Sequence, residues 1–282
     1  MSRFNIKYSK LSPMKTALNY AGILLITVSV SASICAQEKT DWRLSAGMGL
    51  AYSPDYLGAS SSGLSLRPLV SVFYKNIGFS TTGASTLDSF SARATPPGAS
   101  LAYTLSDRLR LGLAIRVDAG RPESSSPALK GLGDIRQTAR ANLFMNYKLS
   151  DQYFLSVGIL PDLLGRNGGI SINASLATQR RLSADWMLVG AIGANASNER
   201  WAQTQFGITP AQSAASGLPV YSPRSGIRDV NAVIGLNYRL SDQWTAFGRV
   251  NYLQLVGDSA NSPITYSKGQ AGAFFGIGYR FF

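Results

Sequence analysis

The sequence predicts an all-β protein: a single up-and-down antiparallel transmembrane β-barrel of about 12 strands that follows a cleaved signal peptide. Three observations lead to this prediction: a signal-like N-terminus, long segments in which apolar and polar residues alternate, and a last segment that alternates and ends on aromatic residues. Alternation with a period of two places one face of a strand in an apolar medium and the other in a polar one. If the apolar medium is lipid, a barrel satisfies every backbone group by closing on itself.

The N-terminus has the order of a secretory signal peptide. Four cations precede an apolar run at 21–30, and small residues follow it. The run is shorter than the roughly 20 residues that a membrane-spanning helix needs. We expect cleavage after Ala36, which divides the chain into a signal peptide at 1–36 and a barrel at 37–282. Cys35, the single cysteine, then leaves with the signal; lipidation there is the alternative, disfavoured by the bulky residue before it.

Composition limits the classes of partner. The formal net charge is +12, with a hydrophobic content of 45%, which is not the composition of a disordered chain. Because the signal region holds four of the cations, the mature chain carries about +8, which suits membrane headgroups and lipopolysaccharide phosphates. Export argues against nucleic acid as a partner. Beyond the signal no apolar run approaches the roughly 20 residues of a transmembrane helix.

Alternating polarity recurs from Trp42 to the end of the chain. The predicted strands are about 9 to 13 residues long, the length that a tilted strand needs to cross a membrane, whereas globular strands average roughly 5 or 6. A secreted soluble β-protein is the alternative, and it leaves the apolar faces unexplained. Twelve strands are predicted, near 42–53, 65–75, 76–83, 98–105, 109–119, 135–149, 152–163, 168–182, 185–197, 227–240, 243–256 and 270–282.

A short turn motif repeats between these strands. Its Ser and Asp side chains are expected to bend the backbone by local hydrogen bonds. Short turns alternate with longer connections, the pattern of outer-membrane barrels with periplasmic turns and external loops. At 83–98 two interpretations stay open, which differ by one hairpin in the strand count. Variants of the turn occur at 103–108, 147–152, 181–186 and 238–244.

The residue types present argue against an enzyme. Histidine is absent, which removes Ser–His and Cys–His nucleophilic systems, histidine bases and imidazole metal sites. The aspartates fall in turns or near strand ends, with no close pair for two-carboxylate chemistry. We therefore assign no catalytic residue, no cofactor and no metal ligand.

The inward face predicted by the alternation is basic. Two interpretations stay open: a pore that favours anions, or a lumen plugged by arginines that pair with aspartates and backbone carbonyls. Because twelve strands enclose a narrow interior, we favour the plugged lumen. The predicted lumen-facing cations are Arg43, Arg110, Arg116, Arg136, Arg140, Arg239 and Arg249, with Lys148 and Arg280 on the same face.

The segment 197–225 is the second candidate site. A connection of this length with several aromatic residues usually folds over something or binds something. By the strand count it is extracellular, so it either caps the barrel or contacts a partner. Its candidate binding residues are Trp201, Phe206 and Tyr221.

The same region carries a resemblance to a known family. The segment 205–222, followed by Gly226-Ile-Arg-Asp-Val230, closely resembles the late part of the MipA/OmpV family of MltA-interacting outer-membrane proteins. The motifs at 238–244 and 255–264 are also similar to that family. Earlier likenesses occur at Tyr56-Leu-Gly58, Arg67–Tyr74 and Gly131–Ile135, and the resemblance covers essentially the whole mature chain. The family usually stops at Tyr-x-Phe, here Tyr279-Arg-Phe281, so Phe282 is one residue extra in the signal that the barrel-assembly machinery reads.

The resemblance implies a protein of the bacterial outer membrane. It implies a scaffold that joins a lytic murein transglycosylase to a penicillin-binding synthase, as the founding member is regarded. The alternatives are a small porin-like channel with a basic lumen, or an adhesin that acts through 197–225. The expected partners are outer-membrane lipid and lipopolysaccharide, the assembly machinery and the two murein enzymes, a lytic transglycosylase and a penicillin-binding protein. No catalytic residue is carried over from the family.

Overall fold

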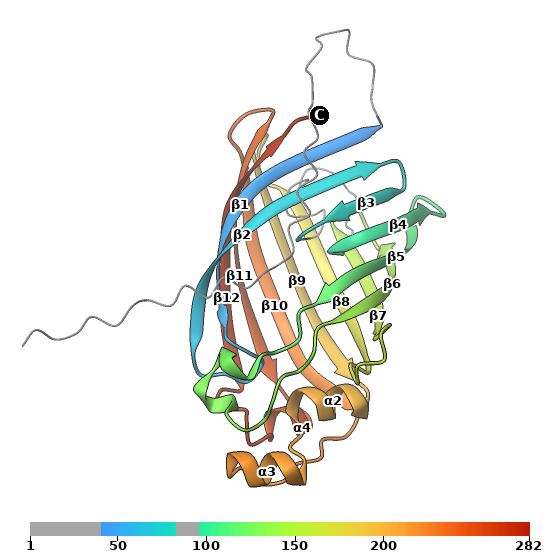
Figure 1. The fold of residues 1–282 in the computed structure, drawn as a ribbon. Coiled ribbons are helices and arrows are strands. Elements are labelled where there is room, and N and C mark those ends of the chain that lie inside the picture. The colour runs from blue at the N-terminus through green and yellow to red at the C-terminus, as the bar shows by residue number, and fades with distance from the viewer. Residues whose placement is uncertain (1–40, 83–95) are drawn as a thin grey trace, which may run out of the picture. The chain divides into compact units, whose positions relative to one another are not determined.

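The computed structural model describes residues 41–82 and 96–282. Twelve strands run antiparallel to their neighbours, and β1 pairs with β12, so the sheet closes into a barrel (Figure 1). The predicted signal peptide, its Cys35 and the segment 83–95 lie outside the described residues. The strands are β1 Trp42–Pro54, β2 Ser62–Tyr74, β3 Ile77–Ser80, β4 Gly98–Thr104, β5 Leu109–Asp118, β6 Thr138–Lys148, β7 Tyr153–Pro161, β8 Ile170–Arg181, β9 Trp186–Ser197, β10 Gly226–Arg239, β11 Trp244–Leu255 and β12 Gly269–Arg280.

The predicted fold class is confirmed, and the differences are at strand ends. β3 is a strand of 4 residues, shorter than the segment 76–83. β6 begins at Thr138 rather than at 135, because Ile135 instead bridges to Arg121 within the preceding connection. Among the described helices, none is long and apolar enough to cross a membrane.

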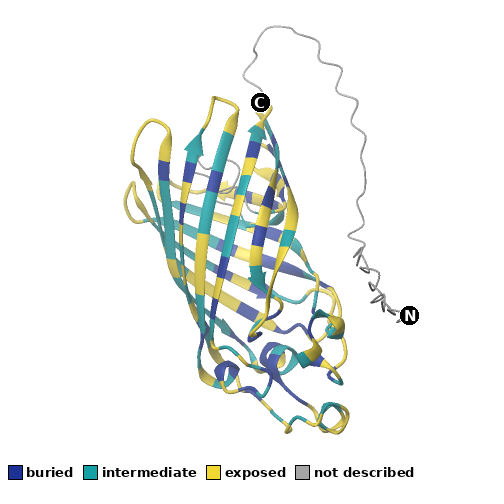
Figure 2. Ribbon diagram, turned by 90° about the vertical axis from the view of Figure 1, so that its left-hand side faces the viewer, coloured by how far each residue is buried: buried dark blue, intermediate teal, exposed yellow. Residues whose placement is uncertain are grey.

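The outer face of the barrel is apolar and uncovered. Leu64, Leu66, Val117 and Ile192 each expose more than 60% of their surface. On β5 and β10, for example, exposed residues alternate with covered ones, and bands of different exposure cross the strands in Figure 2. A water-soluble protein rarely leaves so large an apolar surface uncovered, so this face is the lipid-contacting surface of a transmembrane barrel.

Aromatic rings gather at the end of the barrel that carries the short turns. Rings from neighbouring strands pack in pairs with centroids 4.5 to 5.0 Å apart. Trp and Tyr at this level form the belt that membrane barrels place at the lipid headgroups. The pairs are Trp42 with Tyr74, Trp186 with Tyr238, and Trp244 with Tyr279.

The short turns are built by their serines. Ser106 Oγ accepts hydrogen bonds from the backbone N–H groups of Arg108 and Leu109, at 3.3 and 3.1 Å. Ser150, Ser183 and Ser241 repeat this arrangement in their own turns. The aspartates play a different part from the one predicted: Asp151, for example, forms an ion pair with Lys148 at 2.6 Å.

Glycines on the inner face make room for phenyl rings. Phe73, Phe144 and Phe247 point into the lumen, and the direct cross-strand partner of each is a glycine. A Cβ added at these glycines would collide with the opposite ring. The rings therefore pack against the glycine backbone, which fills part of the narrow interior and helps to fix the register. The pairs are Phe73 with Gly78, Phe144 with Gly112, and Phe247 with Gly276.

This packing makes a prediction about Gly78, whose added Cβ would meet only the Phe73 ring among the three nearest atoms. Gly78→Ala is expected to lower the free energy of unfolding by about 1–3 kcal/mol, because the ring must leave its position. In a Phe73→Ala background Gly78→Ala should lower the free energy of unfolding by less, and the coupling free energy between the two changes should be about 1 kcal/mol or more. Urea unfolding from lipid, followed by tryptophan fluorescence, measures both values.

Gly226→Ala is the matched control, because an added Cβ there has nothing within 4 Å. Its unfolding free energy should stay near that of the wild type. Equal costs for Gly78→Ala in the two backgrounds would show that the ring does not rest on this glycine.

Candidate functional site

The longer connections fold together at the end of the barrel opposite the short turns (Figure 1). We call the segments 55–61, 119–137, 198–225 and 256–268 the cap. They contain short helices, whereas the turns at the other end contain none in the described residues. The cap helices are η1 Glu123–Ser125, η2 Pro127–Leu129, α2 Glu199–Phe206, α3 Pro210–Ser216 and α4 Gly257–Ala260.

Local sequence signals begin and end the two longer cap helices. Asn198 caps α2 by accepting a hydrogen bond from the Trp201 N–H at 3.0 Å. Thr209 and Gln212 form a reciprocal capping box at the start of α3. Gly217 ends α3 with a φ of 76°, a left-handed conformation that glycine adopts without strain.

The cap has a hydrophobic core built from connections far apart in the sequence. One cluster joins all four cap segments, and a second joins α2 and α4 to the end of β11. Phe206, Leu129, Ile208 and Ile264 are fully buried. Burial of this kind orders the connections as a folded unit over the lumen. The first cluster contains Tyr56, Ala59, Leu129, Leu132, Ile208 and Ile264; the second contains Trp201, Phe206, Leu255 and Ala260.

Polar contacts tie the cap segments to one another and to the barrel. Gln270 of β12 accepts from the Gly58 N–H at 3.1 Å and donates to the carbonyls of Tyr56 and Ala59. Arg121 Nη1 donates to the Gln205 carbonyl at 2.8 Å. These bonds satisfy buried backbone groups that would otherwise destabilise irregular structure.

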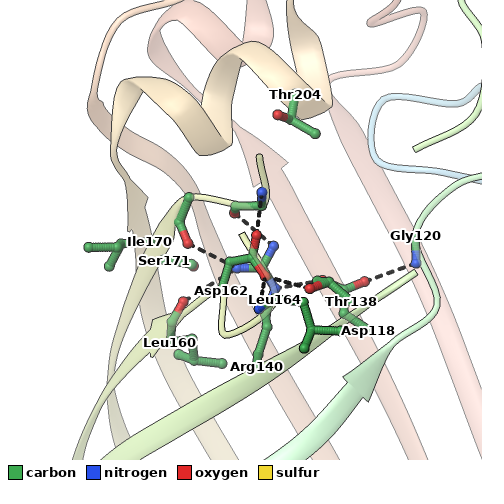
Figure 3. Close-up of polar contacts among 12 residues, drawn as sticks. Asp118, Gly120, Thr138, Arg140, Leu160, Asp162, Leu164, Ile170, Ser171 and Thr204 are labelled. Carbon is green, nitrogen blue, oxygen red and sulfur yellow. Dashed lines mark hydrogen bonds and ion pairs between the residues drawn. The ribbon is translucent and has the colours of Figure 1, made fainter. Parts of the chain in front are cut away.

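Arg140 is the centre of a buried network below the cap (Figure 3). Its side chain is almost fully buried and donates through Nε to Asp118 Oδ2 at 2.6 Å. Nη2 donates to the Gly168 carbonyl at 2.8 Å, and Nη1 reaches two further carbonyls. Asp162 beside it accepts from the Thr138 hydroxyl and from the Gly168 N–H. Arg140 therefore links β5 and β6 to the connection after β7.

A cavity of about 460 Å³ lies between this network and the cap. Its wall combines four arginines with amide side chains and two aromatic residues. The volume is within the range of about 300–1,000 Å³ that small-molecule sites occupy. The polar and aromatic lining consists of Asp55, Tyr56, Arg116, Asp118, Arg121, Ser125, Arg140, Asn142, Ser171, Asn173, Asn195, Trp201, Gln205 and Arg228.

Burial changes the acidity of two groups at the roof of the cavity. It lowers the pKa of Arg121 to about 10, and the guanidinium stays charged at neutral pH. It raises the pKa of Tyr56 to about 12, so the phenol keeps its proton and donates to the Ile264 carbonyl at 3.1 Å. The cavity is thus a positively charged site at physiological pH.

The predicted lumen cations occupy several environments. Arg43 and Arg249 lie over phenyl rings, 5.3 Å from the Phe73 centroid and 5.7 Å from the Phe247 centroid. Arg116 and Arg140 line the cavity. Arg110 is near the turn end of β5, and Arg239 is the last residue of β10. Arg136 differs from the expectation, because it is exposed in the connection before β6.

The predicted loop-binding residues lie inside the cap rather than on it. Trp201 exposes 6% of its surface and Phe206 none, because both form the second core cluster. Tyr221 is half-buried, packs on the first cluster and donates to the Asp258 carbonyl at 2.6 Å. This placement corrects the expectation that they present a contact surface: their aromatic area is used to fold the cap.

Sequence reasoning missed two cavity residues, Arg121 and Arg228. Arg121 is in an irregular connection, where no periodicity indicates which way a side chain points. Arg228 lies at a β-bulge, between Ile227 and Asp229, and this extra residue breaks the simple alternation. The Asp229 carboxylate accepts from Arg228 Nε at 2.6 Å.

The C-terminal residues lie where the sheet closes. Tyr279 packs on Trp244 and on Phe281, and the Phe281 N–H donates to the Leu44 carbonyl. The Phe282 carbonyl accepts from the Leu44 N–H at 3.2 Å. Phe281 and Phe282 are both half-exposed, so burial does not distinguish them as the assembly signal.

These features define a transmembrane β-barrel with a capped, basic interior. The profile of the family described as MltA-interacting protein MipA matches residues 46–281, and the chain belongs to this family. The resemblance seen in the sequence is confirmed. Among individually curated proteins, no sequence matches the chain.

Solved structures of membrane barrels are similar in fold. The NanC porin is 9% identical over 83% of this chain and 98% of its own, with a TM-score of 0.47. A Pseudomonas aeruginosa FadL homologue is 11% identical over 85% and 89%, with a TM-score of 0.39. The CymD monoaromatic hydrocarbon channel is 11% identical over 84% and 88%, with a TM-score of 0.37.

The cap should loosen in acid. The backbone N–H and guanidinium of Arg224 hold the pKa of Asp258 below its ordinary value. A lowered folded-state pKa means that this stabilisation is present above the unfolded pKa of about 3.9 and is lost as the pH falls through the lower folded value. We expect Trp201 fluorescence to change below about pH 4. The measurement uses a protein in which Trp42, Trp186 and Trp244 are replaced by Phe.

Asp258→Asn tests the assignment, because it removes the charge without removing the side chain. Its acid transition should be shallower, with a looser cap already at neutral pH. An unchanged transition would show that another group controls the acid sensitivity.

Proposed function

We propose that the protein is a non-enzymatic barrel of the bacterial outer membrane that serves as a scaffold for murein enzymes. Membership of a family described as MltA-interacting carries this proposal. The apolar outer wall supports a membrane location. The absence of histidine from the sequence supports a role without acid–base catalysis.

The turn end is the surface that we assign to the murein enzymes. The short turns of outer-membrane barrels face the periplasm, where these enzymes work. The turns present exposed cations such as Arg108 and Arg181. A standard interface buries about 800 Å² per partner, so an enzyme there would span several turns at once.

A capture experiment tests the scaffold. The immobilised full-length barrel, in detergent, is expected to retain an MltA-type lytic transglycosylase. The double variant Arg108→Glu, Arg181→Glu should weaken retention several-fold, because charge reversal at an interface rim slows association. Lys130→Glu, an exposed charge reversal in the cap, is the matched control and should retain the enzyme normally. Failure of the wild type to bind the enzyme would exclude the scaffold.

A second candidate function is a narrow channel for anionic solutes. The arginine-lined cavity supports it, because a basic constriction concentrates anions. The inward phenyl rings and the folded cap oppose it, because they reduce the free interior. Arg140 is a poor probe of conduction, since its bonds hold β5 and β6 together.

Arg116 is the better probe of the channel. In planar-bilayer recordings we expect anion-selective steps, and Arg116→Glu should move the reversal potential toward cation preference. A silent wild-type protein, or an Arg116→Glu protein with unchanged selectivity, would remove the channel from consideration.

A further inference from the structure

The charges around the cavity are not all compensated. Four arginines line it, and the carboxylates near them are engaged by only two. Asp118 bonds Arg140, and Asp229 bonds Arg228. Asp55, at the rim, accepts from the Ser61 hydroxyl at 2.5 Å.

Two of the arginines are paired with carboxylates of the fold. Arg140 donates to Asp118 and to backbone carbonyls. Arg228 bonds Asp229, and its guanidinium lies 4.3 Å from the Trp201 ring centroid. Asp229 is completely buried and also accepts from Asn195 at 2.6 Å. The positive charge of each of these two arginines is therefore compensated by a carboxylate of the fold.

The other two arginines retain capacity. Among the described residues, no hydrogen bond or ion pair holds the guanidinium of Arg116, whose charged neighbours are Asp118, Arg140 and Arg228. Arg121 is 8% exposed, and its Nε is buried without a hydrogen-bond partner in the described part of the chain. A buried donor without a partner costs free energy that a ligand acceptor would recover.

An unsatisfied acceptor lies in the same cavity. Asn142 Oδ1 is buried and has no partner among the described residues. It would accept a hydrogen bond from a ligand hydroxyl or amine. The cavity therefore offers guanidinium donors for a negative group and an amide acceptor for a neutral polar one.

We propose that this cavity binds a small organic oxyanion, a carboxylate or phosphate on a hydroxyl-bearing body. Arg116 and Arg121 bind the anionic group, because guanidinium donors match the oxygens of carboxylate and phosphate. Asn142 accepts from a hydroxyl of the body. Asp55 lines the cavity and is exposed to solvent, so the cavity reaches the protein surface at this residue. This binding site is separate from the proposed scaffold surface and requires no conduction through the barrel.

Equilibrium binding tests the site. The purified barrel in detergent is titrated calorimetrically with glucuronate, glucose 6-phosphate and neutral glucose. We expect at least one anion to bind and glucose to bind about tenfold or more weakly, since charge-assisted hydrogen bonds are the strong ones. The anion that binds distinguishes a carboxylate ligand from a phosphate ligand. If neither anion binds to the wild-type protein, the proposal is wrong.

Variants locate the binding. Arg116→Gln should lower the affinity for the anion about tenfold or more. Arg116→Lys should lower it by less, because lysine keeps the positive charge. Arg110→Gln is the matched control: it removes the same charge from the same strand, outside the cavity lining. Equal losses in Arg110→Gln and Arg116→Gln would indicate a general effect of lumen charge and overturn the site.

Asn142→Ala distinguishes recognition of the hydroxyl-bearing body from recognition of the anionic group. It should lower the affinity for the sugar anion and leave the affinity for inorganic phosphate unchanged, because phosphate lacks the hydroxyl-bearing body. Equal weakening of both would refute the role of Asn142. Far-ultraviolet circular dichroism checks that each variant remains a barrel. The Arg116→Gln protein should still capture the transglycosylase. Loss of anion binding would then be independent of the proposed scaffold function.

Discussion

Pairing of β1 with β12 is the constraint on which the rest of the structure depends. In hydrocarbon every backbone N–H and C=O must be bonded within the protein, and closing the sheet removes its two edges. Once the sheet is closed, every strand has lipid on one side and the lumen on the other. The alternation of residues, the aromatic belt and the even number of strands follow from that condition.

Closure of the sheet also encloses an interior space. A barrel of this size leaves a space that side chains nearly fill, and this protein fills it in two ways. Phenyl rings rest on glycines toward the turn end, and a folded cap covers the loop end. The Arg140 network lies below the cap and joins β5 and β6 to the backbone of β7 and of the connection after it. The polar cavity lies between this network and the cap.

The lumen arginines show that one residue type serves different purposes in different surroundings. Arg43 and Arg249 contact aromatic rings, whereas Arg140 pairs with the partly exposed Asp118 and Arg228 with the buried Asp229. Arg116 keeps bonding capacity in the cavity. Composition alone predicts a basic lumen, but the arrangement of partners decides which cations are available to a ligand.

The sequence by itself determined the barrel, its strands and its short turns, because period-two alternation and Ser-containing turns are local properties that a chain carries before it folds. The cap was decided only by tertiary structure. Tyr56 bonds the carbonyl of Ile264, 208 residues away, and no periodic pattern records such a contact. The availability of Arg116, and the burial of Trp201 and Phe206, likewise depend on which distant connections meet above the lumen.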